Sequence, residues 1–537
     1  MIQRLLPLAI AVAVVASTES SHYGWTRASA DGNRWWKHVE FLASDALQGR
    51  NTGTPGHKRA AEYVAEQFKK AGLEPAGTTG YIQTVGFKTR QIDESHSSLS
   101  LTRDGKTIPL TLGEHANFSL RVDPAASIEA PLVFVGHGLE IPEQQINDLD
   151  GLDLKGAVVV YINATPQTLP AALQAHFGSA VERWRMYRAA GAVGTISIAN
   201  PKNIDVPWAR STGQRLQAAM SLADPSLNEY PGQQVAITMN PAYADLLFDG
   251  SGHTFDELVA LDDQGKPVPH FALPARVSAQ ISVTRTQLDS QNVAGILLGT
   301  DPVRRSEFVV LSAHLDHLGV STPIKGDAIY NGAMDNASGV AAILEVAARL
   351  HASGERPARS LIFVAVTAEE KGELGSRYFA ARPTVPRSSI VADINTDMFL
   401  PLFPLRQLMV LGLDESDLGD DVRAVAASAH LEVQRDPEPQ RNRFIRSDQY
   451  SFVRAGIPAL AMKVGYEANT PQEVIAQKWT AERYHAPSDD LAQPVDRESA
   501  DAYVDVVRRL AVRVANRPDR PRWADSSFFR RFAQVAP

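Results

Sequence analysis

Five side chains that commonly bind metal ions are spread over the second half of the chain. They are His314, Asp335, Glu370, Asp397 and His485. Three of them (His314, Glu370 and Asp397) come directly after apolar runs that predict buried strands, and ligands on separate strand ends meet only if the fold brings those ends together. Two imidazoles and three carboxylates, in a sequence without cysteine, suit a pair of divalent cations whose shared water molecule becomes a nucleophile.

The segments around His314 and Asp335 each allow more than one interpretation. Asp316 is placed to accept the ring N–H that His314 does not use for a metal ion, which would fix the tautomer of the ring. His317 is an alternative ligand in the same segment. Asp335 stands directly before an amphipathic helix, where capping is the ordinary role of an aspartate. The small residues around it would equally permit a carboxylate to bridge two cations.

Carboxylates also follow the next two predicted strands. Glu369 and Glu370 come after a wholly apolar strand, and consecutive side chains of an extended chain point in opposite directions. One of the pair can therefore bind a metal ion while the other faces the water molecule as general base. Asp393 and Asp397 fall on one side of the following strand, so alternation does not choose between them. His485 lies in a loop, where a lone histidine is usually exposed.

Together these motifs resemble the family of co-catalytic two-zinc aminopeptidases that also includes the glutamate carboxypeptidases. In chain order the motifs are His314-Leu315-Asp316, Met334-Asp335-Asn336-Ala337-Ser338-Gly339, Ala368-Glu369-Glu370, Asn395-Thr396-Asp397-Met398 and Tyr484-His485. The loop 47–56, with Gly49-Arg50, is similar to the family as well. The segment 126–280, with Val135-Gly136-His137-Gly138, is similar to a protease-associated domain.

The resemblance implies a role for each of these positions. One zinc ion would take His314 and Asp397, the other would take Glu370 and His485, and Asp335 would bridge the two. Glu369 would be the general base, Asp316 would support His314, and Tyr484 would donate to the oxyanion. A cis peptide bond between Asp335 and Asn336 is also implied. The expected activity is that of an exopeptidase, in which a metal-bridging hydroxide removes N-terminal residues from peptides.

Other activities stay open at this point. A carboxypeptidase of the glutamate carboxypeptidase type could use the same metal ions, with Arg443 or Arg446 holding the α-carboxylate of its substrate. A glutaminyl cyclase-like enzyme and a non-catalytic binding relative are further alternatives. The sequence has no Gly-x-Ser-x-Gly and no His-Glu-x-x-His, which disfavours a serine hydrolase and the one-zinc proteases with both histidines on one helix.

The length of 537 residues predicts more than one domain. We expect an α/β catalytic domain, with a mixed, mostly parallel sheet flanked by helices, and an inserted, mainly-β protease-associated domain. The predicted boundaries are 1–16 for a signal peptide, 30–125 and 281–515 for the discontinuous catalytic domain, 126–280 for the insert and 516–537 for a C-terminal tail.

Charge and the first residues bear on partners and location. A net charge of −8 argues against a nucleic-acid partner and leaves peptide substrates as the expected ligands. Arg4, the apolar run after it and the small residues up to Ala16 predict an export signal rather than a membrane anchor, because the run is too short to span a bilayer. Export without cysteine suggests a periplasmic or secreted bacterial enzyme.

Overall fold

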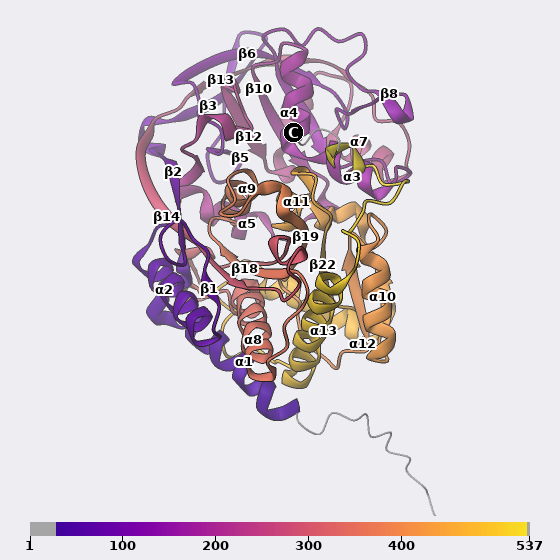
Figure 1. Cartoon of the computed structure of the whole chain (residues 1–537). Helices are drawn as coiled ribbons and strands as arrows, with labels where there is room; N and C mark the ends of the chain where they lie inside the picture. Colours follow the sequence, from indigo (N-terminus) through magenta and orange to yellow (C-terminus); the bar gives the residue numbers. More distant parts are fainter. Residues whose placement is uncertain (1–27, 534–537) are drawn as a thin grey trace, which may run out of the picture.

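The computed structural model describes residues 28–533 of the chain, so the predicted signal peptide 1–16 lies outside the described residues. The described residues contain a ten-stranded sheet in the lower part of the molecule and an eight-stranded sheet in the upper part (Figure 1). None of the helices within 28–533 is long and apolar enough to cross a membrane.

The centre of the ten-stranded sheet consists of parallel strands. β18 (Ser360–Val366), β15 (Phe308–His314), β19 (Ile390–Asn395) and β22 (Ala459–Val464) lie side by side in that order. Every residue of the first three is buried, as expected for parallel strands that are covered on both faces. Most other strands join this centre through antiparallel pairs, so the predicted mixed α/β sheet is confirmed, but parallel pairing is limited to the centre and one edge. The flanking strands are β2 (Ile82–Ile92), β14 (Val283–Leu297), β20 (Gln407–Leu411), the edge strands β11 (Ala219–Leu222) and β21 (Glu432–Arg435), and the short β1 (Glu74–Pro75), which pairs with β14.

Helices cover both faces of this sheet because its apolar side chains alternate between them. From β15, Val309 and Leu311 join the core beneath α1 (Ala28–Leu42), α8 (Ser338–Ser353) and α13 (Arg497–Asn516). Val310 points to the other face, towards Phe379 of α9 (Leu374–Ala381) and Phe452 of α11 (Gln449–Arg454). The other helices of this part are α2 (Pro55–Lys70), α10 (Leu418–Ser428) and α12 (Pro471–Arg483).

The eight-stranded sheet begins earlier in the chain than the boundary predicted at residue 126. Its order is β4 (Lys106–Pro109), β3 (Ser98–Arg103), β13 (Phe271–Gln280), β6 (Ser127–Phe134), β9 (Val158–Asn163), β10 (Gly194–Ala199), β12 (Val235–Met239) and β5 (Ala116–Phe118). Three of these strands precede residue 126, and they belong here because β3 pairs with β13 and β5 pairs with β12. Conversely, β11 lies within residues 126–280 but pairs with β2 of the ten-stranded sheet.

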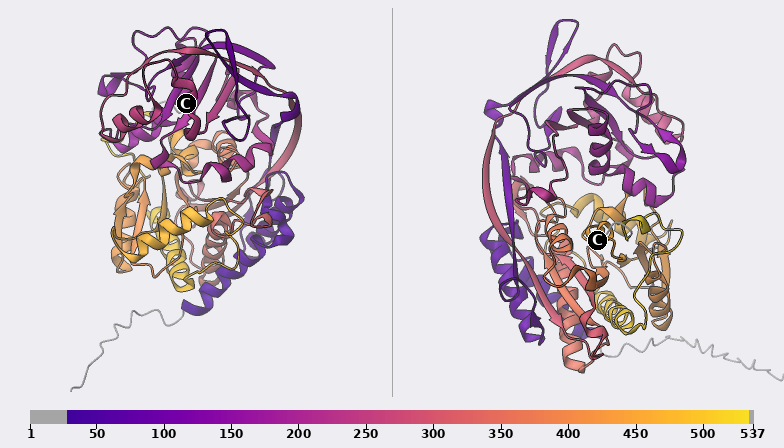
Figure 2. Two further views of the ribbon diagram at one scale, coloured as in Figure 1. Left: turned by 180° about the vertical axis from the view of Figure 1, so that it is seen from behind. Right: turned by 45° about the horizontal axis from the view of Figure 1, so that its top comes forward.

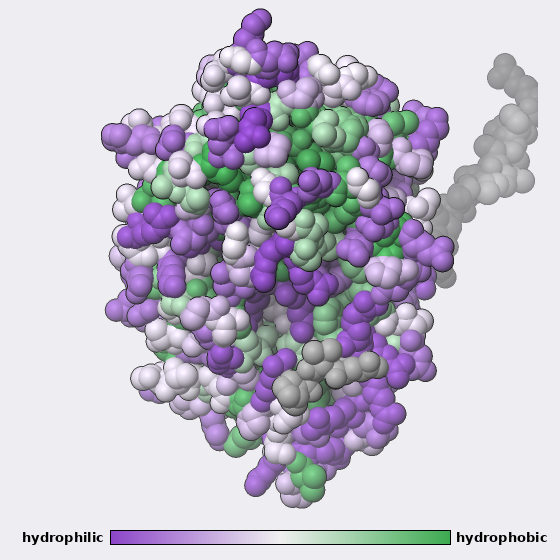
Figure 3. Space-filling model, turned by 90° about the horizontal axis from the view of Figure 1, so that it is seen from above, coloured by the Kyte–Doolittle hydropathy of each residue, from purple (hydrophilic) through white to green (hydrophobic). Residues whose placement is uncertain are grey.

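Short helices accompany the eight-stranded sheet. They are α3 (Ala171–Gly178), α4 (Ala180–Ala189), α5 (Trp208–Ser211), α6 (Asp245–Phe248) and α7 (Phe255–Asp263). The long pair β2 and β14 runs up one side of the molecule and links the two parts (Figures 1 and 2). Seen from above, the upper part presents hydrophilic and apolar residues interspersed across its surface (Figure 3).

The predicted C-terminal tail is packed against the rest of the molecule up to residue 533. Phe529 is fully buried, and its ring centroid lies 5.5 Å from that of Phe444. The ring of Phe528 lies 5.0 Å from that of His176 in α3. Arg531, in the short helix α14 (Arg530–Ala533), donates to Glu143 of the upper part at 2.5 Å. These apolar rings make the segment a structural link between the two parts rather than a solvated tail.

Candidate metal centre

The five candidate ligands meet at the carboxyl ends of the parallel strands. His314 is the last residue of β15, Glu370 follows β18 and Asp397 follows β19. Asp335 precedes α8, and His485 comes after the C-terminal end of α12. The carboxyl edge of a parallel sheet is where ligand sites of open α/β folds usually form, because the loops after several strands converge there.

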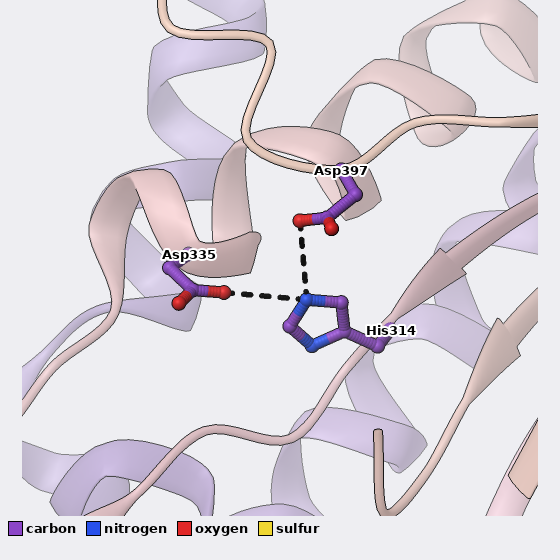
Figure 4. A group of neighbouring side chains, drawn as sticks. All are labelled: His314, Asp335 and Asp397. Carbon is purple, nitrogen blue, oxygen red and sulfur yellow. Dashed lines mark hydrogen bonds and ion pairs between the residues drawn. The ribbon is translucent and has the colours of Figure 1, made fainter. Parts of the chain in front are cut away.

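One group of ligands surrounds His314 (Figure 4). Its Nε2 atom lies 3.2 Å from Oδ1 of Asp335 and 3.3 Å from Oδ1 of Asp397. Its other nitrogen, Nδ1, lies 3.1 Å from the main-chain carbonyl oxygen of Asp316. In the neutral ring that donates to this carbonyl, Nε2 turns its lone pair towards two carboxylate oxygens. A cation between the three atoms would convert this repulsion into coordination, so the donor set fits a metal ion.

A second group of ligands uses the other oxygen of Asp335. His485 Nε2 lies 3.3 Å from Asp335 Oδ2 and 3.3 Å from Glu370 Oε2. His317 Nδ1 lies 2.7 Å from Glu370 Oε1 and 3.8 Å from Asp335 Oδ2. Both histidines thus face this position, with His317 fully buried and the His485 side chain 25% exposed. Because Asp335 gives one oxygen to each group, the geometry is that of two adjacent cation positions bridged by a carboxylate.

The centre carries an excess of negative charge. Burial by itself lowers the pKa of His314, but Glu369, Asp335 and Asp397 outweigh burial and raise that pKa well above its usual value. Burial also opposes protonation of His485, yet Glu370 and Asp335 raise its pKa to about 10. Clustered buried carboxylates that draw protons onto neighbouring imidazoles are an environment that stabilises divalent cations.

Asp316 supports the centre through different atoms from those expected. His314 is held by the main-chain carbonyl of Asp316, whereas the carboxylate accepts from the backbone N–H of Glu369 at 3.0 Å and of Glu370 at 3.4 Å. The hydroxyl of Thr52, from the loop 47–56, donates to the same carboxylate at 3.1 Å. Asp316 therefore fixes the turn that carries both glutamates. The peptide bond between Asp335 and Asn336 is cis, which confirms that expectation.

Two further residues position the loops of the centre, and their roles were not predicted from the sequence. Asn336 donates to the carbonyl oxygen of Thr396 at 2.9 Å and accepts from the N–H of Met398 at 3.2 Å, which joins the Asp335 loop to the Asp397 loop. Asp489 accepts from the N–H of Asp335 at 3.0 Å and so joins the Asp335 loop to the His485 loop. Only weak signals for them are present in the sequence: Asn336 directly follows the candidate ligand Asp335, and Asp489 is a carboxylate shortly after His485.

Arg50, noted only as part of a similar loop, has a clear structural role. Its buried guanidinium donates to the carbonyl oxygens of Leu315 at 3.0 Å, Asn331 at 2.6 Å and Gly332 at 3.0 Å. These carbonyls belong to the segments that follow His314 and precede Asp335. One buried side chain thus fixes the spacing of both segments.

Tyr484 and the two arginines considered for a carboxypeptidase lie on one side of the centre. Burial raises the pKa of Tyr484 well above its usual value, and although Arg446 opposes that shift, the acids Asp335, Glu370 and Glu369 add to it. The phenol therefore stays a donor. Arg446 donates to Asp205 at 2.7 Å, and Arg443 donates to Asp436 at 3.0 Å and also to Glu438. Both arginines are thus paired with acids of the chain itself.

Comparison with known proteins finds a match to one family model and a shared fold. Residues 292–511 match the family model for peptidase family M28. The structure of an aminopeptidase from Aneurinibacillus sp. strain AM-1 is similar over 91% of this chain and 95% of that chain, at 19% identity and a TM-score of 0.52. A zinc aminopeptidase from Bacillus subtilis matches at 18% identity over 90% and 95% of the two chains, with a TM-score of 0.48.

These matches bear on the predictions in different ways. The family match confirms the recognition of a metallopeptidase family over residues 292–511. The Aneurinibacillus structure shows that the fold is shared over nearly the whole chain. That the segment 126–280 is a protease-associated domain stays a prediction.

Proposed function

We propose that the chain is a zinc-dependent aminopeptidase, on the premise that residues 292–511 match the model of peptidase family M28. The observation that carries the proposal is the split use of Asp335, whose two carboxylate oxygens face two separate donor groups. The first zinc ion would be held by His314 and Asp397, the second by Glu370 and His485, and both by Asp335. Bound there, the two ions would polarise the scissile carbonyl group and lower the pKa of a water molecule towards neutrality.

The proton transfers are proposed for Glu369. Burial raises the pKa of this carboxyl well above its usual value, and Glu370 and Asp448 raise it further, although His314 opposes them. A carboxyl with a raised pKa can accept a proton from water and pass it to the leaving amine near neutral pH. The Tyr484 phenol would donate a hydrogen bond to the oxygen on which negative charge develops.

The charges around the centre favour an aminopeptidase over a carboxypeptidase. An acidic centre attracts the ammonium group at a peptide's N-terminus, whereas the α-carboxylate of a carboxypeptidase substrate needs an available cation. Arg443 and Arg446 are paired with Asp436, Glu438 and Asp205. Peptides blocked at either the amine or the carboxyl terminus separate the two activities: only N-terminal blocking should abolish cleavage.

Metal removal tests the proposal directly. Dialysis against a chelator should abolish hydrolysis of leucine p-nitroanilide, and zinc should restore it as the protein regains about two ions per chain. The measurement pairs elemental analysis with the rate at each stage. Full activity after metal removal would overturn the proposed mechanism, and recovery with one ion per chain would overturn the two-ion site.

Export is proposed separately, on the basis of the segment 1–16. Expression of the full chain in a bacterium should give a mature protein outside the cytoplasm that lacks the apolar segment. N-terminal sequencing of the fractionated protein tests this, and an intact N-terminus in the cytoplasmic fraction would contradict it.

A further inference from the structure

A cavity of about 230 Å³ opens beside the metal centre. Asp397 and Tyr484 line it, so the cavity and the centre share side chains. Its floor is one face of the antiparallel pair β20 and β22, where Met409 lies opposite Lys463 and Leu411 opposite Ala461. A dry apolar cavity of about 150 Å³ can hold benzene, so this one can hold a single amino-acid side chain.

The walls of this cavity are mainly apolar. They include Met398, Leu402, Phe403, Val464 and Tyr466, together with Ala476 from α12. The upper rim carries Asp205 and the arginines Arg441 and Arg446, which bind that aspartate from the lower part. A side chain that enters the cavity therefore meets both hydrocarbon and charged groups.

Lys463 is the exceptional residue of the floor. The three arginines of the lining are paired with Asp205, Asp436 and Glu438. The side chain of Lys463 has no hydrogen bond or ion pair with any described residue, although the charges of Asp397 and Arg443 act on it. Burial lowers the pKa of this amine. A buried lysine without an ion-pair partner is costly, and the cost is offset when a ligand places a carboxylate beside it.

We propose that Lys463 makes the cavity selective for an acidic side chain, so that peptides with an N-terminal glutamate are the preferred substrates. The inference rests on the proposed aminopeptidase function, which places the first residue of the substrate next to Asp397 and Tyr484. The apolar walls would pack the methylene groups of glutamate, and the Lys463 ammonium would pair with its carboxylate. Glutamine has the same shape without the charge, so the contrast between the two isolates the ammonium.

The test compares glutamyl, glutaminyl and leucyl p-nitroanilides with the zinc-loaded full-length enzyme. The expected kcat/KM is about tenfold or more higher for the glutamyl than for the glutaminyl substrate. Lys463→Met, which keeps the length of the side chain, should remove that preference and leave leucyl hydrolysis within about threefold of the wild type. Lys478→Met, at an exposed lysine of α12, is the matched control and should keep the preference.

Each outcome bears on a different claim. A wild-type enzyme that cleaves the leucyl substrate without preferring glutamyl over glutaminyl overturns the inference and leaves the proposed function standing. An unchanged preference in Lys463→Met overturns the role of this lysine. A wild-type enzyme that cleaves none of the three overturns the proposed function and the inference together. If Lys463→Met does not fold, Lys463→Gln and the wild-type glutamyl-to-glutaminyl ratio keep the inference open to refutation.

Discussion

Adjacent glutamates at the centre occupy different environments. Both oxygens of Glu370 face imidazoles, Oε1 towards His317 and Oε2 towards His485. Glu369 has no ion pair among the described residues, while its backbone N–H is fixed by the Asp316 carboxylate. The alternation of an extended chain predicted this division, and burial of the turn enforces it.

Replacement of each glutamate by glutamine should therefore have different results. Glu369→Gln removes the proton acceptor but no metal ligand, so kcat should fall by about 10²–10⁴-fold with the zinc content unchanged. Glu370→Gln should lose zinc as well as activity, because a ligating charge is removed. Turnover on leucine p-nitroanilide and zinc per chain are the two measurements. A Glu369→Gln variant with wild-type turnover would show that another group is the base.

The sequence predicted the ligands better than the residues that position them. His314 and Glu370 were predicted because each follows an apolar strand, a pattern that is local, whereas Asp397 was chosen over Asp393 only through the family resemblance. Asn336 and Asp489 act through backbone groups of residues distant in the chain, and no local pattern reports such contacts. Asp316 lies against the ring of His314 as predicted, but the contact uses its main-chain oxygen, which the sequence pattern did not specify.

At the scale of elements, Arg50 joins segments that no strand or helix connects. It binds main-chain carbonyls on both sides of the centre, including that of Leu315. Arg50→Met should destabilise the protein by about 3–5 kcal/mol, since several buried carbonyl groups would lose their donor. The Tm of thermal unfolding and the affinity for zinc should both be lower in this variant than in the wild type. The exposed Arg59→Met is the matched control, and an equal loss in the two variants would refute this role.

A buried histidine in α2 predicts a loss of stability in acid. Burial lowers the pKa of His57 to about 4, from 6.5 in the unfolded chain. Below pH 6.5 the unfolded state therefore binds a proton that the folded state excludes, so this contribution to stability falls as the pH drops from 6.5 to 4. The loss amounts to about 3 kcal/mol. His57→Gln should flatten the dependence of Tm on pH between pH 6.5 and 4. An unchanged slope in this variant would show that other groups cause the loss of stability.

The central strands could be predicted because parallel strands covered on both faces are continuously apolar. β14 was missed because its first half, from Val283 to Asp289, is mostly exposed and polar and gains its pairing only from β2. Strands that are specified by a distant partner leave a weak pattern in their own residues. The same reason explains the early start of the eight-stranded sheet, whose first strands pair far along the chain.

At the scale of the whole molecule, the upper part reaches the metal centre directly. Arg210 of α5 donates to the carbonyl oxygens of Tyr484 at 2.5 Å and Ala481 at 2.6 Å, at the end of α12. Asp205 binds Arg446, which adjoins Tyr484. The segment that leads into His485 is therefore held partly from the upper part, so the two parts together shape the site.

The C-terminal segment gives the last prediction, because it links the two parts on the side away from β2 and β14. Phe529 is fully buried against Phe444 and Tyr450 of the lower part, and the neighbouring Phe528 contacts His176 of α3. Phe529→Ala should lower the free energy of unfolding by about 3–5 kcal/mol through the cavity it leaves. It should also speed hydrogen exchange in α3 more than in α8.

A matched control separates this link from a general loss of aromatic packing. Phe41 of α1 is 40% exposed and stacks on Tyr63 with ring centroids 3.9 Å apart, so Phe41→Ala removes an aromatic ring at the surface of the lower part alone. Phe41→Ala should lower the free energy of unfolding by less than about 1.5 kcal/mol, with hydrogen exchange in α3 unchanged. If the C-terminal segment joins the two parts, loss of the Phe529 ring must change hydrogen exchange in α3. A Phe529→Ala variant with wild-type exchange in α3 would therefore contradict the link, even if its Tm were lower.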